Sequence, residues 1–316
     1  MTVPGNLDRA PAGADAGDIQ ARLMLVTLCL IWGLTWPMMK IALNEIPPFS
    51  MRTLTAGIGA LVLIAICIVK RRSLRVPVGK AWVHVVVASL LNMVGFTVLS
   101  AFAQIAAATS RVAILTYAMP IWAMLLTWVI LRERPTRIQG VALALCVLGL
   151  GVLIRPLATT GIPLGLLLAI GSGFSWAAGT VYVKWARIDA DPMGVASWQV
   201  TIAFFIIGAC LSIFEGRLHL DAAHADGLLA VAFTGVAGNA IAYAMWFEIV
   251  RRVSAVTATL GILGIPVIGV LSSVLILGER PTNTDIIGFA LIFAASACVL
   301  LTPAASASGA KKSATG

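Results

Sequence analysis

The sequence predicts an all-α polytopic membrane protein with ten transmembrane helices arranged as two inverted five-helix repeats. Three observations lead to this prediction. Of the 316 residues, 60% are hydrophobic and 11% are charged, which lies outside the usual range of soluble globular domains. Apolar windows about 20 residues long recur along the chain, and each can cross a hydrocarbon core of roughly 30 Å as a helix. A unit of five such windows occurs twice, with the charges of its loops reversed the second time.

The expected spans alternate with short polar connections. Residues 81–110 contain no Lys, Arg, Asp or Glu, and this stretch is too long for one crossing but too short for two. A turn is therefore expected at 104–109, between the third and fourth spans. The ten spans are 22–43, 49–69, 82–103, 108–131, 138–154, 162–184, 193–214, 228–250, 254–278 and 284–302.

Both ends of the chain lie outside these spans. Residues 1–21 are polar and rich in Ala, Gly and Asp, and they lack the basic and then apolar pattern of a cleavable signal peptide. Residues 303–316 are of low complexity and are expected to be disordered. Lys and Arg are more numerous in the loops on the N-terminal side of the membrane. This asymmetry predicts a protein of the cell membrane with both termini in the cytoplasm.

Short sequence stretches reveal the repeat. ERPT occurs at 133–136 and again at 279–282. Further upstream, WGLTWPMMK (32–40) corresponds to WAAGTVYVK (176–184). The repeated units are residues 22–154 and 162–302, and because each holds five spans, the second must be inverted in the membrane.

The loops agree with an inversion. Residues 70–80 carry five basic residues, whereas their counterpart, residues 215–227, carries one Arg against one Glu and two Asp. Inverted repeats are a recurrent architecture of secondary transporters, in which the two halves rock around one site near the midplane.

Two prolines occupy equivalent places in the repeat. Pro120 and Pro266 each lie 13 residues before the Glu of ERPT, near the middle of a span. A mid-helix proline frees a carbonyl group at membrane depth. We therefore expect a kink or a hinge at both positions, beside the site. ERPT itself is read as a tight helical hairpin, with its Pro at the start of the next helix and its Glu near that helix's N-terminus.

The repeated unit resembles a known family. Its first span carries Trp and then Lys eight residues later, and its fourth carries Pro followed by a terminal Glu. These features are similar to the EamA-like family of the drug/metabolite transporter superfamily, over residues 22–302. The resemblance implies ten helices and the export or uptake of small metabolites.

Candidate substrate-binding residues are the deep aromatic and amide side chains. An amide in hydrocarbon must form a hydrogen bond, either to another helix or inside a wet cavity. Aromatic walls suit a small amphipathic solute, because they bind its apolar part by contact area and an ammonium group by cation–π attraction. The candidates are Trp32, Trp36, Asn92, Tyr117, Trp176, Asn239, Tyr243 and Trp246.

Two basic residues near span ends have two interpretations. Lys40 and Arg52 either reach to the membrane interface or form an entrance charge that attracts carboxylates. For Arg52 we favour the entrance charge, because this residue lies about one turn into its span and its counterpart in the repeat is the uncharged Gln199.

The expected function is a secondary carrier, an exporter or facilitator, of a small amphipathic metabolite such as an amino acid or a related compound. A passive pore and a lipid-handling scaffold stay open as alternative functions. The expected partners are the small-molecule substrate and the lipid bilayer, and assembly into a homo-oligomer also stays open. A membrane enzyme is disfavoured, since the sequence holds no HExxH, CxxC or Walker motif. No cofactor, metal or nucleic-acid partner is expected. None of the 13 acidic residues lies near the middle of a span, so we expect facilitated diffusion or exchange rather than proton coupling.

Overall fold

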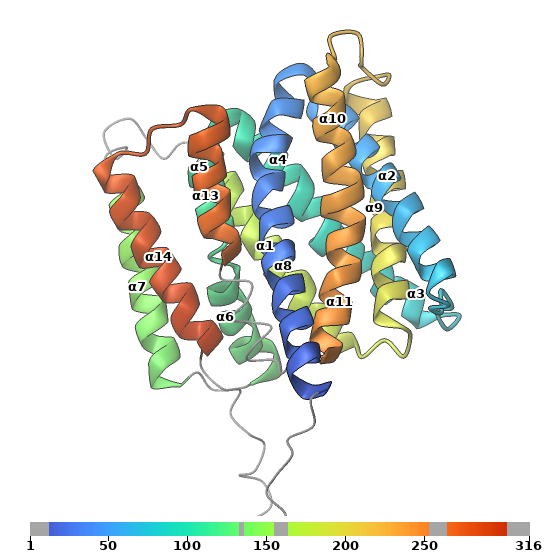
Figure 1. Ribbon diagram of the computed structural model, residues 1–316, viewed down its shortest axis with the longest axis horizontal. Helices are drawn as coiled ribbons and strands as arrows, with labels where there is room; N and C mark the ends of the chain where they lie inside the picture. Colours follow the sequence, from blue (N-terminus) through green and yellow to red (C-terminus); the bar gives the residue numbers. More distant parts are fainter. Residues whose placement is uncertain (1–12, 133–135, 155–163, 253–263, 302–316) are drawn as a thin grey trace, which may run out of the picture.

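Helices form the whole of the architecture that the computed structural model describes, and they run side by side in one bundle (Figure 1). The described residues are 13–132, 136–154, 164–252 and 264–301, and no strand occurs among them. A helix satisfies its own backbone hydrogen bonds, as an apolar surrounding requires.

The helices divide into an N-terminal and a C-terminal group. The first comprises α1 (Gly13–Glu45), α2 (Pro48–Val69), α3 (Lys80–Ser89), the π-helix η1 (Leu90–Gly95), α4 (Phe96–Ala106), α5 (Thr109–Thr116), α6 (Met119–Leu131) and α7 (Arg137–Ile154). The second comprises α8 (Leu164–Ala186), α9 (Pro192–Phe214), α10 (Ala225–Phe233), the π-helix η3 (Thr234–Ile241), α11 (Ala242–Arg252), α13 (Gly264–Leu277) and α14 (Asn283–Leu301).

Within the described part of the chain, 7 helical segments are long and apolar enough to cross a membrane. Shorter apolar helices accompany them at Gly140–Leu153, Gly264–Leu277 and Asn283–Ala295. The outward faces of both the long and the short helices carry large apolar side chains, such as Leu61 of α2 at 73% and Leu275 of α13 at 81% exposure. Continuous apolar surface of this kind is rare on proteins surrounded by water. The bundle is therefore built for a lipid surrounding.

Helices far apart in the sequence pack side by side. α1 packs along α13 and α4 along α8, while α2 packs against α9 and α7 against α14. The α7–α14 pair lies at one edge of the bundle in Figure 1. Small residues permit the close approach, since a Cβ atom on Gly149 of α7 would lie 3.1 Å from the Gly288 carbonyl oxygen of α14.

Two of the segments long enough to cross a membrane contain a π-helical turn. η1 separates α3 from α4 and carries Asn92, and η3 separates α10 from α11 and carries Asn239. Apolar periodicity gives no sign of either turn, because it does not report the register of backbone hydrogen bonds. π-helical turns inside α-helices occur frequently at functional sites.

The fourth expected span is divided into two helices, with the break directly before Pro120. α5 ends at Thr116, and Pro120 lies in the first turn of α6, where a missing amide donor has no cost. The end of α5 is held by α8, since Thr116 Oγ1 lies 3.1 Å from Ser172 Oγ. Pro266 is near the beginning of α13, and the preceding residues 253–263 lie outside the described part.

Two other boundaries concern the expected tail and turn. α1 begins at Gly13, so the described part of the expected tail, from Gly13 onward, is helical and continues into the first span. The turn expected at 104–109 lies at residues 107–108, between α4 and α5. Glu133 and Pro135 of the first ERPT stretch lie outside the described residues.

Candidate functional site

A cavity of about 500 Å³ lies among α1, α2, α4, α8, α9 and α11. Its volume is within the range of small-molecule sites, and both groups of helices contribute to its walls. The eight residues expected from the sequence all line it: Trp32, Trp36, Asn92, Tyr117, Trp176, Asn239, Tyr243 and Trp246.

Aromatic rings form one wall of the cavity. Tyr243 makes an edge-to-face contact with Trp32, with ring centroids 5.8 Å apart, and stacks on Trp176 at 6.4 Å. Trp246 lies 6.3 Å from Trp32. The Trp32 indole is fixed in place, because its Nε1 donates a 3.1 Å hydrogen bond to the Gly238 carbonyl oxygen of η3. A fixed aromatic wall of this kind binds apolar groups without losing much side-chain freedom.

A second aromatic pair belongs to the same cavity. The rings of Trp36 and Tyr117 meet edge to face with centroids 6.3 Å apart. Trp36 lies on the same helix as Trp32, one turn further along, and its side chain is buried. The break between α5 and α6 places Tyr117 against it.

The two asparagines combine both roles considered for them. Asn92 Nδ2 donates to Gln199 Oε1 at 3.2 Å, and Asn239 Nδ2 donates to the Thr55 carbonyl oxygen at 3.1 Å. Each therefore bonds across helices while also lining the cavity. A glycine lets another helix approach each asparagine closely. A Cβ atom on Gly59 of α2 would lie 2.6 Å from the Asn239 Cβ, and one on Gly179 of α8 would clash with the Asn92 side chain.

Arg52 lies inside the protein and not at an entrance. Its side chain lines the cavity and the residue is 3% exposed. Nη1 contacts Met39 Sδ at 2.9 Å, and Nη2 donates to Ser100 Oγ at 2.9 Å. Lys40, by contrast, does not line the cavity; its Nζ donates to the Gln104 carbonyl oxygen at 2.7 Å. The two basic residues expected at an entrance thus lie in different surroundings, Arg52 in the cavity lining and Lys40 outside it.

The cavity extends toward one end of the bundle. It reaches the connection between α8 and α9, where Arg187 and Pro192 are exposed. α1 begins and α14 ends on this same lower side in Figure 1. No residue described in the connections at the upper end lines the cavity.

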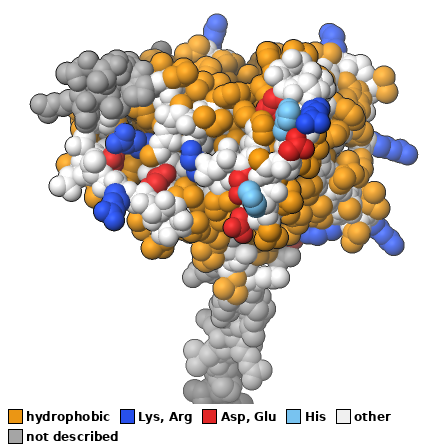
Figure 2. All heavy atoms as spheres, turned by 90° about the horizontal axis from the view of Figure 1, so that it is seen from above, with side chains coloured by type: hydrophobic (Ala, Val, Ile, Leu, Met, Phe, Trp, Pro, Cys, Tyr) orange, Lys and Arg blue, Asp and Glu red, His pale blue; other side chains and the backbone are white. Residues whose placement is uncertain are grey.

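Carboxylates from other elements cap three helices at the upper end. Glu215 accepts hydrogen bonds from the amides of Phe49 and Ser50 in the first turn of α2, both at 2.8 Å. Glu45 accepts from the amide of His224, the N-cap residue of α10, at 2.8 Å. Figure 2 looks onto this end and shows acidic and histidine side chains gathered among hydrophobic ones. Each cap satisfies amides that the helix leaves unpaired and complements its positive end.

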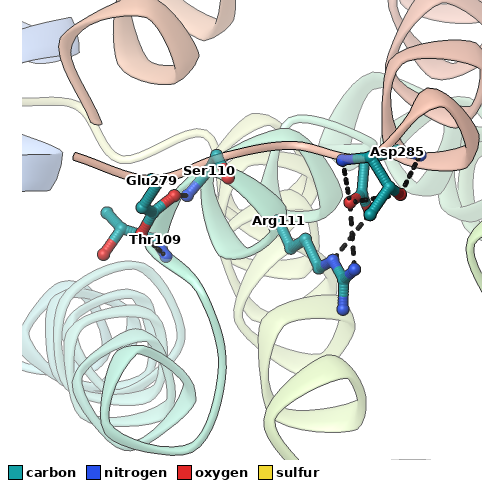
Figure 3. Close-up of polar contacts among 6 residues, drawn as sticks. Thr109, Ser110, Arg111, Glu279 and Asp285 are labelled. Carbon is teal, nitrogen blue, oxygen red and sulfur yellow. Dashed lines mark hydrogen bonds and ion pairs between the residues drawn. The ribbon is translucent and has the colours of Figure 1, made fainter. Parts of the chain in front are cut away.

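The third cap ties α5 to the connection before α14 (Figure 3). Glu279 accepts from the amides of Thr109 and Ser110, the latter at 2.9 Å. Beside it, Arg111 forms a two-pronged ion pair with Asp285, at 2.6 Å and 2.9 Å. Glu279 therefore serves α5 rather than the helix that follows it in the sequence, which corrects the expected role of ERPT. The helix that follows, α14, is capped by Thr282 and Asp285.

Comparison with known proteins identifies the family. The sequence model of the EamA-like transporter family matches this chain twice, at residues 20–155 and 163–301. The chain belongs to the EamA-like transporter family. Members of the EamA-like family are membrane transporters of small molecules and not enzymes, and this chain is accordingly a membrane transporter.

Several EamA-like relatives align over most of their length. The uncharacterized transporter YvbV of Bacillus subtilis is 26% identical, covering 89% of this chain and 91% of the relative. YoaV of the same organism is 22% identical, over 87% and 94%. A Salmonella typhimurium relative, named as a probable amino-acid metabolite efflux pump, is 24% identical, over 86% and 91%. A crystal structure superimposes with a TM-score of 0.63 and 24% identity, over 89% of this chain and 98% of the other, which shows a shared fold.

Some residues of the site in this EamA-like chain were not foreseen from the sequence. Met39, Phe96 and Gln199 line the cavity. Met and Phe are common in helices packed inside membranes, whereas Gln199 was noted only as the uncharged counterpart of Arg52, although its buried amide was a signal of the same kind as those of Asn92 and Asn239. The available signal was position: Met39 lies one turn after Trp36 on the same helix face. Phe96 packs edge to face on Trp176 with centroids 4.9 Å apart.

Proposed function

We propose that the protein is a secondary carrier that moves a small amphipathic metabolite across the cell membrane by alternating access. The observation that supports this most strongly is the asymmetry of the cavity. It extends to exposed residues at the end where α1 begins, while capped helix ends occupy the opposite end. This arrangement is that of a carrier in a state whose binding site is accessible from one side of the membrane, whereas the cavity of an open pore would reach both ends of the bundle.

The proposed moving parts are two inverted five-helix halves, residues 22–154 and 162–302, which together cross the membrane ten times. The two family matches support this division. Helix packing supports an inverted pseudo-twofold relation, because α2 pairs with α9, α7 pairs with α14, and α1 meets α13 as α8 meets α6. The π-helical turns η1 and η3 occupy corresponding places.

We place the lower end of Figure 1 in the cytoplasm. The loop at residues 70–80, rich in Lys and Arg, follows α2 at that end (Figure 1), and such loops stay inside. The upper end, with its capping carboxylates, would then face outward, and the structure would correspond to an inward-facing state.

Amino acids and related metabolites are the solutes that we propose. The aromatic wall of Trp32, Trp176, Tyr243 and Trp246 and the volume of about 500 Å³ suit a solute of this size. The Salmonella relative, named for amino-acid metabolite efflux, supports the same class and favours export or facilitated movement.

Thiol labelling tests the inverted arrangement. In a cysteine-free background, Arg75→Cys in the 70–80 loop should react with a membrane-impermeant reagent only from the cytoplasmic side. Asp221→Cys in the 215–227 loop should react only from the outside. Both residues are exposed, so failure to react would not be caused by burial. Labelling of both from one side would contradict the inverted halves.

Counterflow in proteoliposomes tests the carrier. A panel of labelled amino acids and small metabolites should contain a solute whose exchange saturates, and a pH gradient alone should not drive its accumulation. The reason is that the cavity lining, among described residues, contains no Asp, Glu or His on which proton binding could be linked to the conformation. Flux that does not saturate would indicate a pore instead, and no transport of any solute in the panel would favour the lipid-handling scaffold. Uphill accumulation that a protonophore abolishes would contradict the absence of proton coupling.

A further inference from the structure

Arg52 carries a charge that no described residue of the protein neutralises. The residue lies on α2, about one turn from its N-terminus, and is 3% exposed. None of the ion pairs among the described residues includes it. Burying an unpaired charge costs several kcal/mol, roughly, even after the surroundings relax. A charge retained at such cost inside a cavity calls for a partner of opposite sign.

The hydrogen bonds of the guanidinium leave room for such a partner. Arginine has five N–H donors in a planar fork. Here Nη1 donates to Met39 Sδ and Nη2 donates to Ser100 Oγ. Both partners are neutral, and a thioether sulfur is a weak acceptor. The buried Nε has no hydrogen-bond partner within the described part of the chain. The free donors suit a carboxylate, which accepts two parallel N–H bonds from this fork.

The rest of the lining limits the charge of the ligand. Among the described lining residues the charged ones are Arg52 and Arg187, and the latter is exposed at the lower end. One buried cation neutralises one negative charge, so a ligand with several negative charges would leave some unpaired. The described lining offers no carboxylate to an ammonium group, but the faces of Trp32 and Trp176 can bind one by cation–π attraction.

We infer that Arg52 is the anion-binding group of the cavity, and that the solute carries one carboxylate, held by Arg52, and an apolar part held by the aromatic wall. This inference rests on the proposed carrier function and narrows its substrate class to small monocarboxylates and amino acids. Gln199, the neutral counterpart of Arg52 in the second half, also lines the cavity. The solute is therefore bound asymmetrically although the two halves are similar.

Four matched probes test this assignment on the purified full-length protein in nanodiscs, by equilibrium dialysis. Phenylacetate and L-phenylalanine carry the carboxylate, phenylacetamide replaces it with a neutral amide, and phenethylamine lacks it. The wild-type protein should bind at least one of the carboxylate probes ten or more times more tightly than phenylacetamide and phenethylamine. Arg52→Gln should abolish that preference, and Arg52→Lys should keep part of it.

The control is Arg217→Gln, which removes an exposed positive charge from the upper loop and should leave the preference unchanged. A merely structural role for Arg52 would weaken all four probes equally in Arg52→Gln. That result, an unchanged preference in Arg52→Gln, or no binding of any probe to the wild type would each overturn the inference. Binding that follows the carboxylate without any counterflow would instead contradict the carrier function and leave the assignment of Arg52 standing.

Discussion

Trp32→Ala is expected to weaken binding of the transported solute about tenfold or more. Trp32 contacts Tyr243 and Trp246 and is fixed by its bond to η3, so its removal takes away contact area and also loosens the wall. Burial of a large side chain contributes about 1.5–3 kcal/mol, and about 1.4 kcal/mol corresponds to a tenfold change in affinity. The measurement is the half-saturation concentration of counterflow for the solute found in the panel.

Trp128→Ala is the matched control for that experiment. Trp128 lies on α6, is 47% exposed and does not line the cavity. Its loss should leave the half-saturation concentration unchanged. Equal effects of the two replacements, or no effect of Trp32→Ala at normal expression, would show that the aromatic wall does not bind the solute.

Glu279→Gln is expected to raise the population that is open at the upper end about tenfold. The carboxylate caps the N-terminus of α5 from the segment before α14, so this end cannot separate without breaking both bonds. Hydrogen bonds to charged groups contribute about 1.5–3 kcal/mol each, and an amide retains only a weaker, neutral acceptor. Ala42→Cys reports the opening, because Ala42 is fully buried in the same cluster as Val112 of α5. Its reaction with an impermeant thiol reagent applied from the upper side should accelerate.

Asp221→Asn controls for the loss of one negative charge at the same end. Asp221 is exposed and pairs with the equally exposed Arg217, a contact that contributes little to stability. Labelling of the cysteine at position 42 should not change in this variant. An acceleration of the same size, or none in Glu279→Gln, would mean that the cap does not hold the end closed.

The sequence located the aromatic and amide residues of the cavity because their depth in a span can be counted along the chain. Trp32 and Trp36 share a helix face by spacing alone, and Asn92 and Asn239 correspond in the repeat. Arg52 was foreseen as functional but placed at an entrance, because its position in the span says nothing about where a long, flexible side chain ends.

The missed features depend on contacts distant in sequence or on backbone register. Glu279 caps a helix 170 residues away, which local spacing cannot reveal. A kink or a hinge was expected at Pro120, but hydropathy does not show that the span divides into two separate helices, α5 and α6. The break became apparent only from the α8 side chains that support the end of α5.

The π-helical turn η3 links backbone register to the composition of the aromatic wall. Tyr243 and Trp246 follow η3 directly on α11, whereas Trp32 belongs to another helix. If η3 tightened to an α-helix, the shift of one residue in hydrogen-bond register would turn everything beyond it by about 100° about the helix axis. Tyr243 and Trp246 would then rotate away from Trp32 without any side chain changing its rotamer. A screw motion of the backbone would thereby separate the rings of the aromatic wall. The same change at η1 would rotate Phe96, which follows it on α4.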